Sequence, residues 1–190
     1  ALPATVHASD WADRVDLTDI PLVTIDGEDA RDFDDAVYGT PAVLSGRGKS
    51  AKTGWRLLVA IADVSHYVQN GNAIDIDAYD RATSVYFPRR VIPMLPEKLS
   101  NELCSLRPNE DKLTFSAVFV FDKNHKIVQR WFGKTVIHSD RRFTYEEAQQ
   151  IIETGKGDFA EEVLTLNRLA QRMRKTRFKH GAVSFQREEA

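Results

Sequence analysis

Near the start of the sequence, a segment of ten residues holds Asp26, Asp32, Asp34 and Asp35, with Glu28 and Asp29 beside them. Two carboxylates about 4 Å apart repel by roughly 4 kcal/mol at an effective dielectric constant near 20. A converging cluster must therefore be protonated, turned to solvent, or neutralised by a cation. Hard oxygen ligands favour Mg²⁺, Mn²⁺ or Ca²⁺. The cluster predicts a metal site of the kind that supports phosphodiester hydrolysis, with a solvated acidic loop as the alternative interpretation.

Other candidate residues are less informative. The run Gly48-Lys49-Ser50 lacks the glycine that a phosphate-binding loop needs five positions earlier, because Val43 stands there. The single cysteine, Cys104, cannot form an internal disulfide, so it predicts a reducing compartment and a small buried side chain. One cysteine and scattered histidines cannot build a tetrahedral zinc site. His66 is expected to be structural rather than catalytic.

The charge balance hides two opposite segments. Lys and Arg total 26 and Asp and Glu total 28, so the net charge is −2 and does not suggest a generally basic nucleic-acid-binding surface. Residues 1–50, however, hold ten acids and four bases, whereas residues 163–187 hold seven bases and no acid. In that second segment Arg168, Arg172, Lys175 and Lys179 recur at helical steps, so they form either a phosphate-tracking face or a solvated helix face. Tyr86 and Phe185 are aromatic residues that could stack on bases.

Local patterns predict a mixed α/β or α+β fold. Strands are expected at 22–25, 36–38, 55–62, 113–121 and 126–137, with 55–62 buried on both faces and 39–54 an exposed loop. Helices are expected at 74–86, at 144–153 behind a Thr144–Glu147 capping box, and from Asp158 to Gly181, with a strand start at 182–185. The last helix has an apolar stripe that ends at Ala170 and Met173. No apolar run approaches the roughly 20 residues of a membrane span, so no membrane partner is expected.

Several blocks of the sequence follow one another in a distinctive order. The first is VTIDGEDARDFDDAV at 23–37, and the others are 59–68, 83–88, 92–96 and 99–106. Together they resemble the RNase II/RNase R (RNB-domain) family of exoribonucleases, and the GEDARDFDD form of the first block resembles the RNase R branch. The resemblance runs from about residue 14 to residue 190. It implies an α+β catalytic domain with a mixed, largely antiparallel sheet and flanking helices.

The resemblance also implies an activity and site residues. The activity is processive, hydrolytic 3′→5′ degradation of single-stranded RNA from its 3′ end, releasing nucleoside 5′-monophosphates with Mg²⁺ or, alternatively, Mn²⁺. By this resemblance Asp26, Asp32 and Asp35 ligate metal, and Asp34 shares the metal site as the catalytic residue. The same resemblance makes Tyr86 and Phe185 an aromatic clamp on the terminal bases, and it places Tyr145 near the sugar, where a hydroxyl can sense the 2′-OH.

The resemblance further suggests that the chain is one part of an enzyme. We expect residues 1–190 to be the N-terminal portion of the catalytic domain, with 1–20 as a lead-in and without the rest of that domain or the flanking OB-type domains. Such a fragment is expected to be a cytoplasmic monomer, inactive or weakly active alone. A non-catalytic RNA-binding module of the same fold is the alternative, and a phosphohydrolase of small molecules is a third possibility that would not need the aromatic residues or the basic segment.

Overall fold

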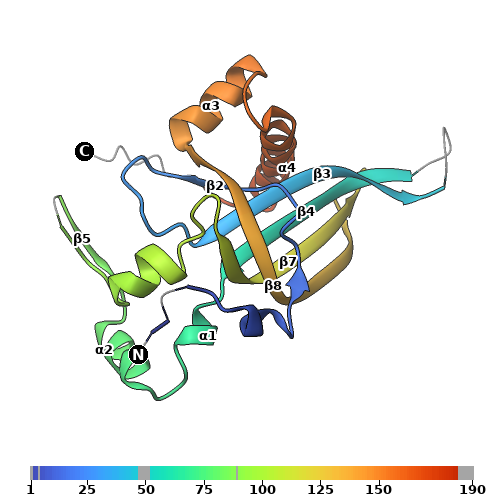
Figure 1. The fold of residues 1–190 in the computed structure, drawn as a ribbon. Helices are drawn as coiled ribbons and strands as arrows, with labels where there is room; N and C mark the ends of the chain where they lie inside the picture. Colours follow the sequence, from blue (N-terminus) through green and yellow to red (C-terminus); the bar gives the residue numbers. More distant parts are fainter. Residues whose placement is uncertain (1, 4, 47–51, 89, 184–190) are drawn as a thin grey trace.

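The computed structural model describes residues 2, 3, 5–46, 52–88 and 90–183, and it shows strands curved around one core with helices outside them (Figure 1). The strands are β1 (Val15–Asp16), β2 (Leu22–Asp26), β3 (Asp35–Ser45), β4 (Lys52–Ala62), β5 (Val85–Phe87), β6 (Arg90–Ile92), β7 (Asp111–Asp122) and β8 (Ile127–Thr144). The helices are η1 (Ala8–Trp11), α1 (Val64–Tyr67), α2 (Ala73–Arg81), the π-helical η3 (Lys98–Leu103), α3 (Tyr145–Thr154) and α4 (Ala160–Lys179). None of these helices is long and apolar enough to cross a membrane.

The main sheet closes on itself through its longest strand. Its order is β1-β8-β2-β3-β4-β7, and β7 pairs with β8 as well, so the strands form a barrel. The first part of β8 lies antiparallel to β7, and its last residues, up to Thr144, lie parallel to β2. The β2–β3, β3–β4 and β4–β7 pairs are antiparallel. This mixed, largely antiparallel sheet with flanking helices confirms the expected fold class.

Small hydroxyl side chains occupy part of the barrel interior. Thr114, Ser116 and Thr135 are fully buried, and the Thr135 hydroxyl lies 2.6 Å from each of the other two. Phe115, between them on β7, points to the outside and is 48% exposed. Inward and outward side chains therefore alternate along this part of β7, and the polar side chains are the inward ones. A barrel of few strands leaves room for small side chains, and these hydroxyls satisfy one another.

Two expectations for the β3–β4 hairpin were wrong. Residues 39–45 and 52–54 are strand rather than loop, because they continue the cross-strand register, in which Pro41 pairs with Trp55. Pro41 is tolerated because β2 pairs with β3 only at Val37, which leaves the other side of β3 open there. Strand β4 is also buried on one face only, since Ile61 is 46% exposed. Its long apolar run reflects an outer face that the described residues cover only in part.

The helices follow the sequence more closely. The capping box is confirmed, with the Thr144 hydroxyl accepting from the Glu147 amide at 3.1 Å and the Glu147 carboxylate accepting from the Thr144 amide at 2.9 Å. Helix α4 ends before Gly181, as expected, but Asp158 does not cap it. The prediction of the apolar stripe on α4 was partly wrong, because Met173, at its end, is 45% exposed. The helix expected at 74–86 is shorter in the structure, because α2 ends at Arg81 and strand β5 begins at Val85.

A second small core fixes α3 and α4 at one end of the barrel. Its buried side chains are Val23, Phe143, Ala148, Ile151 and Val163. They join β2 and the C-terminal end of β8 to both helices. Helix α4 also contacts β3. Because β2 ends at Asp26 and β8 ends at Thr144, this core sets the position of the acidic loop relative to the start of α3.

Candidate active site

The acidic loop, residues 26–35, joins two neighbouring strands of the barrel. Asp26 is the last residue of β2 and Asp35 the first residue of β3, so both are placed by strand pairing. Asp32 and Asp34 lie on the loop between them, and these two and Asp35 are exposed. Asp26 is partly buried, and its Oδ2 atom is buried without a hydrogen-bond partner among the described residues. Of these four aspartates, three therefore have accessible carboxylates and one is poorly solvated.

The pKa values show that these carboxylates lie close enough to repel one another. Burial, followed by the charges of Asp35 and Asp34, raises the pKa of Asp26 to about 6, although Arg142 acts in the opposite direction. Burial and then the charge of Asp34 also raise the pKa of Asp35. Within the described residues, no three His, Cys, Asp or Glu side chains are already arranged to hold a metal ion. The donors of a cation site are thus gathered on one loop, but they do not form a finished ligand cage.

Arg142 on β8 holds one side of the loop. Its Nη2 atom donates to the carbonyl oxygens of Gly27, at 2.6 Å, and Glu28, at 2.8 Å. Its guanidinium also lies 5.4 Å from the centroid of the Phe33 ring. No local pattern pointed to Arg142, because it acts across more than a hundred residues and its strand was expected to end at 137. It is the supporting residue that sequence reasoning missed.

The other side of the loop is held by the segment after η3. The Ser105 hydroxyl donates to the Arg31 carbonyl at 2.7 Å, and the Leu106 amide donates to the Phe33 carbonyl at 2.7 Å. Phe33 itself is buried and anchors the loop in the main core. At the end of β4 the Ala62 amide donates to the Asp34 carbonyl at 2.9 Å. The backbone of the acidic loop is thus fixed by three separate elements while its carboxylates stay accessible.

The structure brings Tyr145 to this loop. Asp26 and Thr144 are register partners in the β2–β8 pair, so the first residue of α3 follows directly beside the end of β2. A methyl group on Gly27 would lie 3.9 Å from the Tyr145 ring, which places that ring against the loop backbone. Tyr145 is 61% exposed. Its hydroxyl is therefore available to a ligand bound over the acidic loop.

Tyr86 reaches the same region from the β5–β6 hairpin. A cleft of about 610 Å³ lies between the hairpin, the acidic loop and η3. Its lining includes Asp32, Arg31, Tyr86 and Arg90. The Tyr86 ring is 69% exposed, as a stacking surface would need to be. Phe185, the expected partner of Tyr86, lies outside the described residues.

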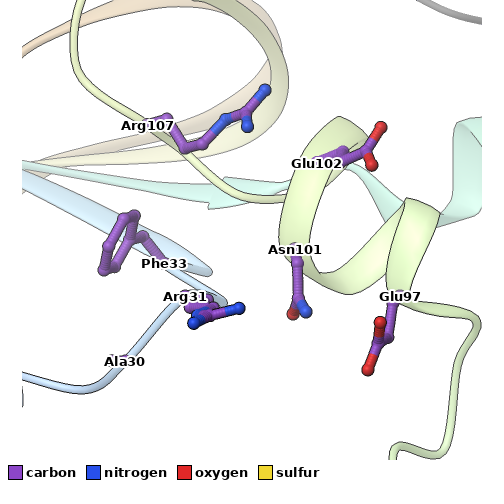
Figure 2. A pocket seen from close by; sticks show the side chains of 7 residues that line it. All are labelled: Ala30, Arg31, Phe33, Glu97, Asn101, Glu102 and Arg107. Carbon is purple, nitrogen blue, oxygen red and sulfur yellow. The ribbon is translucent and has the colours of Figure 1, made fainter.

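A smaller cavity of about 360 Å³ lies behind the loop (Figure 2). Arg31 points from the loop toward Asn101 on η3, and Phe33 and Arg107 lie on the opposite side of the cavity from Glu97 (Figure 2). Arg31, Glu97 and Asn101 also line the larger cleft, so the two spaces share a wall. Both spaces therefore lie between the acidic loop and η3.

Comparison with known proteins connects this arrangement to one family. The RNB domain matches residues 14–190. The chain is 45% identical over 186 residues to Ribonuclease R of Escherichia coli, covering 94% of this chain and 22% of that protein. Its structure superimposes on Mycoplasma genitalium RNase R in complex with ribose-methylated single-stranded RNA with a TM-score of 0.85, at 30% identity, covering 97% of this chain and 29% of that one.

One structural neighbour is not a nuclease. Yeast Ssd1, a pseudonuclease, superimposes with a TM-score of 0.75 at 21% identity, covering 93% of this chain and 21% of that one. At that identity the likeness shows the fold alone. The barrel is therefore compatible with both catalytic and non-catalytic proteins, so function depends on the side chains at the acidic loop.

Proposed function

This chain belongs to the RNB-domain family of exoribonucleases, and from that premise we propose that it carries the metal-binding and 3′-end-holding part of a 3′→5′ exoribonuclease. The observation that supports this proposal best is the acidic loop, where Asp26 and Asp35 have raised pKa values and Asp26 Oδ2 is buried without a partner among the described residues. The chain spans about a fifth of the length of the E. coli relative. The activity, substrate and partners of a whole enzyme are therefore part of the proposal.

The donor set fits a hard divalent cation, Mg²⁺ or alternatively Mn²⁺. Asp26, Asp32, Asp34 and Asp35 offer only carboxylate oxygens, which are the ligands these ions prefer. A cation would also remove the repulsion that raises the pKa of Asp26 and Asp35. When bound, such a cation would supply positive charge at the phosphate oxygens and at the oxygen of the attacking water. We propose that these four residues hold it, directly or through water.

The cleft between the acidic loop and the β5–β6 hairpin is the proposed seat of the RNA 3′ end. The exposed Tyr86 ring offers a surface for a terminal base, and stacking is worth about 1–3 kcal/mol per base without reading sequence. Arg31 and Arg90 line the same cleft and can contact phosphates. Tyr145 lies against the loop, where its hydroxyl can meet a ribose 2′-OH. This geometry would place the last phosphodiester bond over the carboxylates.

Asp34 is the residue that we propose takes part in the reaction itself. Its carboxylate is exposed, and its backbone carbonyl accepts a hydrogen bond from the Ala62 amide, so the residue is anchored at the end of β4 while its side chain stays accessible. It can accept the proton of a water whose oxygen attacks the terminal phosphorus. The bond from phosphorus to the 3′ oxygen then breaks, and the 3′ oxygen takes up a proton from solvent. The products are a nucleoside 5′-monophosphate and a shortened RNA that ends in a 3′-hydroxyl. Repetition without release would make the degradation processive.

We further propose that these 190 residues alone are inactive or weakly active, and that the protein is a cytoplasmic monomer. The chain covers 29% of the Mycoplasma RNase R chain, so most of the residues of such an enzyme have no counterpart in it. Addition of Mg²⁺ and a 3′-labelled single-stranded RNA to the chain should therefore give at most slow release of label. Rapid release would contradict this part of the proposal.

A non-catalytic RNA-binding module is the second candidate function. The observation that favours it is the absence, within the described ranges, of three side chains already arranged around a metal position. The Asp34→Asn substitution in a full-length protein carrying this segment separates the two functions. A nuclease should lose at least about a hundredfold in RNA hydrolysis, as expected for loss of a proton acceptor, while RNA affinity stays within a factor of about three. Unchanged hydrolysis would contradict the role of Asp34.

Metal binding can be tested without activity. Mn²⁺ added to the chain should be bound and detected as loss of the free-ion signal in electron paramagnetic resonance. Asp26→Asn and Asp35→Asn should each weaken this binding, whereas Asp80→Asn, at an exposed residue on α2, should not. Equal binding by all of these proteins would show that the loop does not hold the cation.

A further inference from the structure

A second basic and aromatic surface lies farther along the β3–β4 hairpin, away from the strand ends that carry the acidic loop. We propose that it is a distal binding surface for the RNA strand, formed by one face of α4 and the Trp55–His125 pair. This inference rests on the proposed action on RNA but names a contact that the acidic loop and the Tyr86 cleft do not provide. It also decides between the two interpretations left open for the basic segment 163–187.

The cations form one row along the helix. Arg168, Arg172, Lys175 and Lys179 follow one another at steps of four, three and four residues, so they share one face of α4. At 1.5 Å per residue the row extends over about 16 Å, enough for several consecutive phosphates. In the part of the chain that the structure describes, none of the four forms a salt bridge, although Arg14, Arg81, Arg107, Lys112 and Arg141 all do. The row therefore keeps its charge for an external anion.

Aromatic rings lie beside this row. Trp55 on β4 and His125 in the β7–β8 turn stack with their centroids 4.7 Å apart and an interplanar angle of 21°. Together with Arg168, Arg172 and Lys175 they line a cleft of about 490 Å³. A smaller recess of about 150 Å³ continues past His125 to Lys179. Cations along a groove with a flat π surface inside it form the arrangement that binds single-stranded nucleic acid without sequence preference.

The acid that begins the β7–β8 turn is already engaged. Asp122 starts the turn that carries His125, and its carboxylate accepts from the backbone amides of Asn124 and Lys126 at 2.8 and 2.9 Å. It therefore closes the turn instead of pairing with α4. The two acids at the start of α4, Glu161 and Glu162, precede the basic row by at least a full turn. The cleft consequently has a net positive charge, with its stacking surface held by the turn.

The distance from the acidic loop fits an RNA strand that reaches both places. Asp35 begins β3 and pairs with Ile61, whereas Pro41 pairs with Trp55 farther along the same hairpin. From Asp35 to Pro41 the strand rises about 20 Å. A strand whose 3′ end lies over the acidic loop would need only a few more nucleotides to reach Trp55. The proposed surface would then hold RNA upstream of the reacting end.

The test measures binding of a fluorescein-labelled 20-nucleotide oligouridylate to the chain in EDTA by fluorescence anisotropy. Arg172→Glu with Lys175→Glu should weaken binding at least tenfold and make the slope of log affinity against log salt shallower by about 1.4, as expected for two lost phosphate contacts. The control, Arg130→Glu with Lys156→Glu, makes the same change of net charge at exposed sites outside the cleft and should weaken binding less than threefold. Equal weakening by both pairs would overturn the proposal, because it would show only an effect of total charge.

The aromatic part is tested separately. Trp55→Leu should weaken binding about fivefold or more, and Trp55→Phe should retain most of the affinity, with circular dichroism confirming that both variants fold. A 4-thiouridine in the middle of the oligonucleotide should cross-link to α4 or the β7–β8 turn, and one at its 3′ end should cross-link near Tyr86. Cross-links only near Tyr86 would overturn the distal surface while supporting the proposed function, and absence of both would contradict the proposed function as well. Competition by polyphosphate as effectively as by RNA would mark a general polyanion surface and overturn the RNA assignment.

Discussion

Two aspartates that are buried or partly buried, Asp63 and Asp26, differ in whether their carboxylates have hydrogen-bond partners. Asp63, which follows β4, is 4% exposed, and its carboxylate accepts from Arg14 Nη2 at 2.7 Å and from the Ser65 hydroxyl at 2.6 Å. Ala62, the residue before it, holds the backbone of Asp34 in the acidic loop. There, Asp26 is partly buried and its Oδ2 atom has no partner among the described residues.

The pKa values of the two aspartates differ accordingly. Burial raises the pKa of both, but at Asp63 the hydrogen bonds from Ser65 and Arg14 outweigh it and hold the pKa below the usual range. At Asp26 the charges of the neighbouring carboxylates add to burial and raise the pKa to about 6. Burial alone therefore does not decide whether a carboxylate stabilises a fold. Asp63 serves the structure, whereas the acidic loop retains at neutral pH a negative charge that a bound cation would neutralise.

The largest effect on stability is expected from removing one member of the Arg14–Asp63 ion pair. Asp63→Leu leaves the Arg14 guanidinium, whose side chain is 3% exposed, without its carboxylate. Removing one partner of a buried ion pair typically destabilises a protein by about 3–5 kcal/mol. Urea denaturation at pH 7 measures the change. The double variant Arg14→Met with Asp63→Leu removes both charges and should recover more than half of the loss; if it is no more stable than the single variant, lost packing rather than an unpaired charge is the cause.

A smaller effect is expected from loosening the acidic loop without touching its carboxylates. Arg142→Ala removes both hydrogen bonds to the carbonyls of Gly27 and Glu28. Residues that orient metal ligands typically contribute 10–100-fold to metal affinity. Mn²⁺ titration should therefore show a loss of about that size, and Arg141→Ala on the neighbouring residue is the matched control. Unchanged affinity would mean that the loop does not need Arg142 to present its carboxylates.

The sequence was sufficient for features with local signals. The capping box at Thr144, the strand that ends at Asp26 and the end of α4 before Gly181 are each determined by a few adjacent residues. The same holds for the gathering of acids between two strands. These features were predicted because hydrogen bonding and periodicity within a short segment are enough to specify them.

The features that the sequence did not predict depend on contacts between residues far apart in the chain. Arg142 meets the acidic loop only because β8 runs far enough to pair with β2, and no local pattern extends that strand. The inward direction of Thr114 and Ser116 depends on closure of the barrel, which leaves Phe115 between them on the outside. The place of Tyr145 beside Gly27 likewise follows from the β2–β8 register. Register between distant strands cannot be derived from periodicity, which is the same in every register of equal parity.

A modest gain in stability is expected from removing the uncompensated charge. The folded-state pKa of Asp26, about 6, lies above its unfolded value near 4. Its contribution to stability is therefore complete below pH 4 and is lost as the pH rises through 6. In metal-free buffer at pH 8, Asp26→Asn should raise the free energy of unfolding by about 1–2 kcal/mol, after allowance for solvent screening at this partly exposed site. At pH 4 the gain should disappear, whereas a gain that is equal at both pH values would point to a cause other than charge.

The smallest effect is expected at the point where the acidic loop meets α3. Thr144→Ala removes the hydroxyl that accepts from the Glu147 amide, and loss of such a cap costs about 1 kcal/mol. Thr144→Ser keeps the hydroxyl and should be nearly neutral. Because Thr144 is the register partner of Asp26, the loss also tests whether the acidic loop depends on the start of α3 or on strand pairing alone. If strand pairing is enough, Mn²⁺ affinity should be unchanged in Thr144→Ala while thermal stability falls; a parallel loss of both would show that the helix start supports the acidic loop.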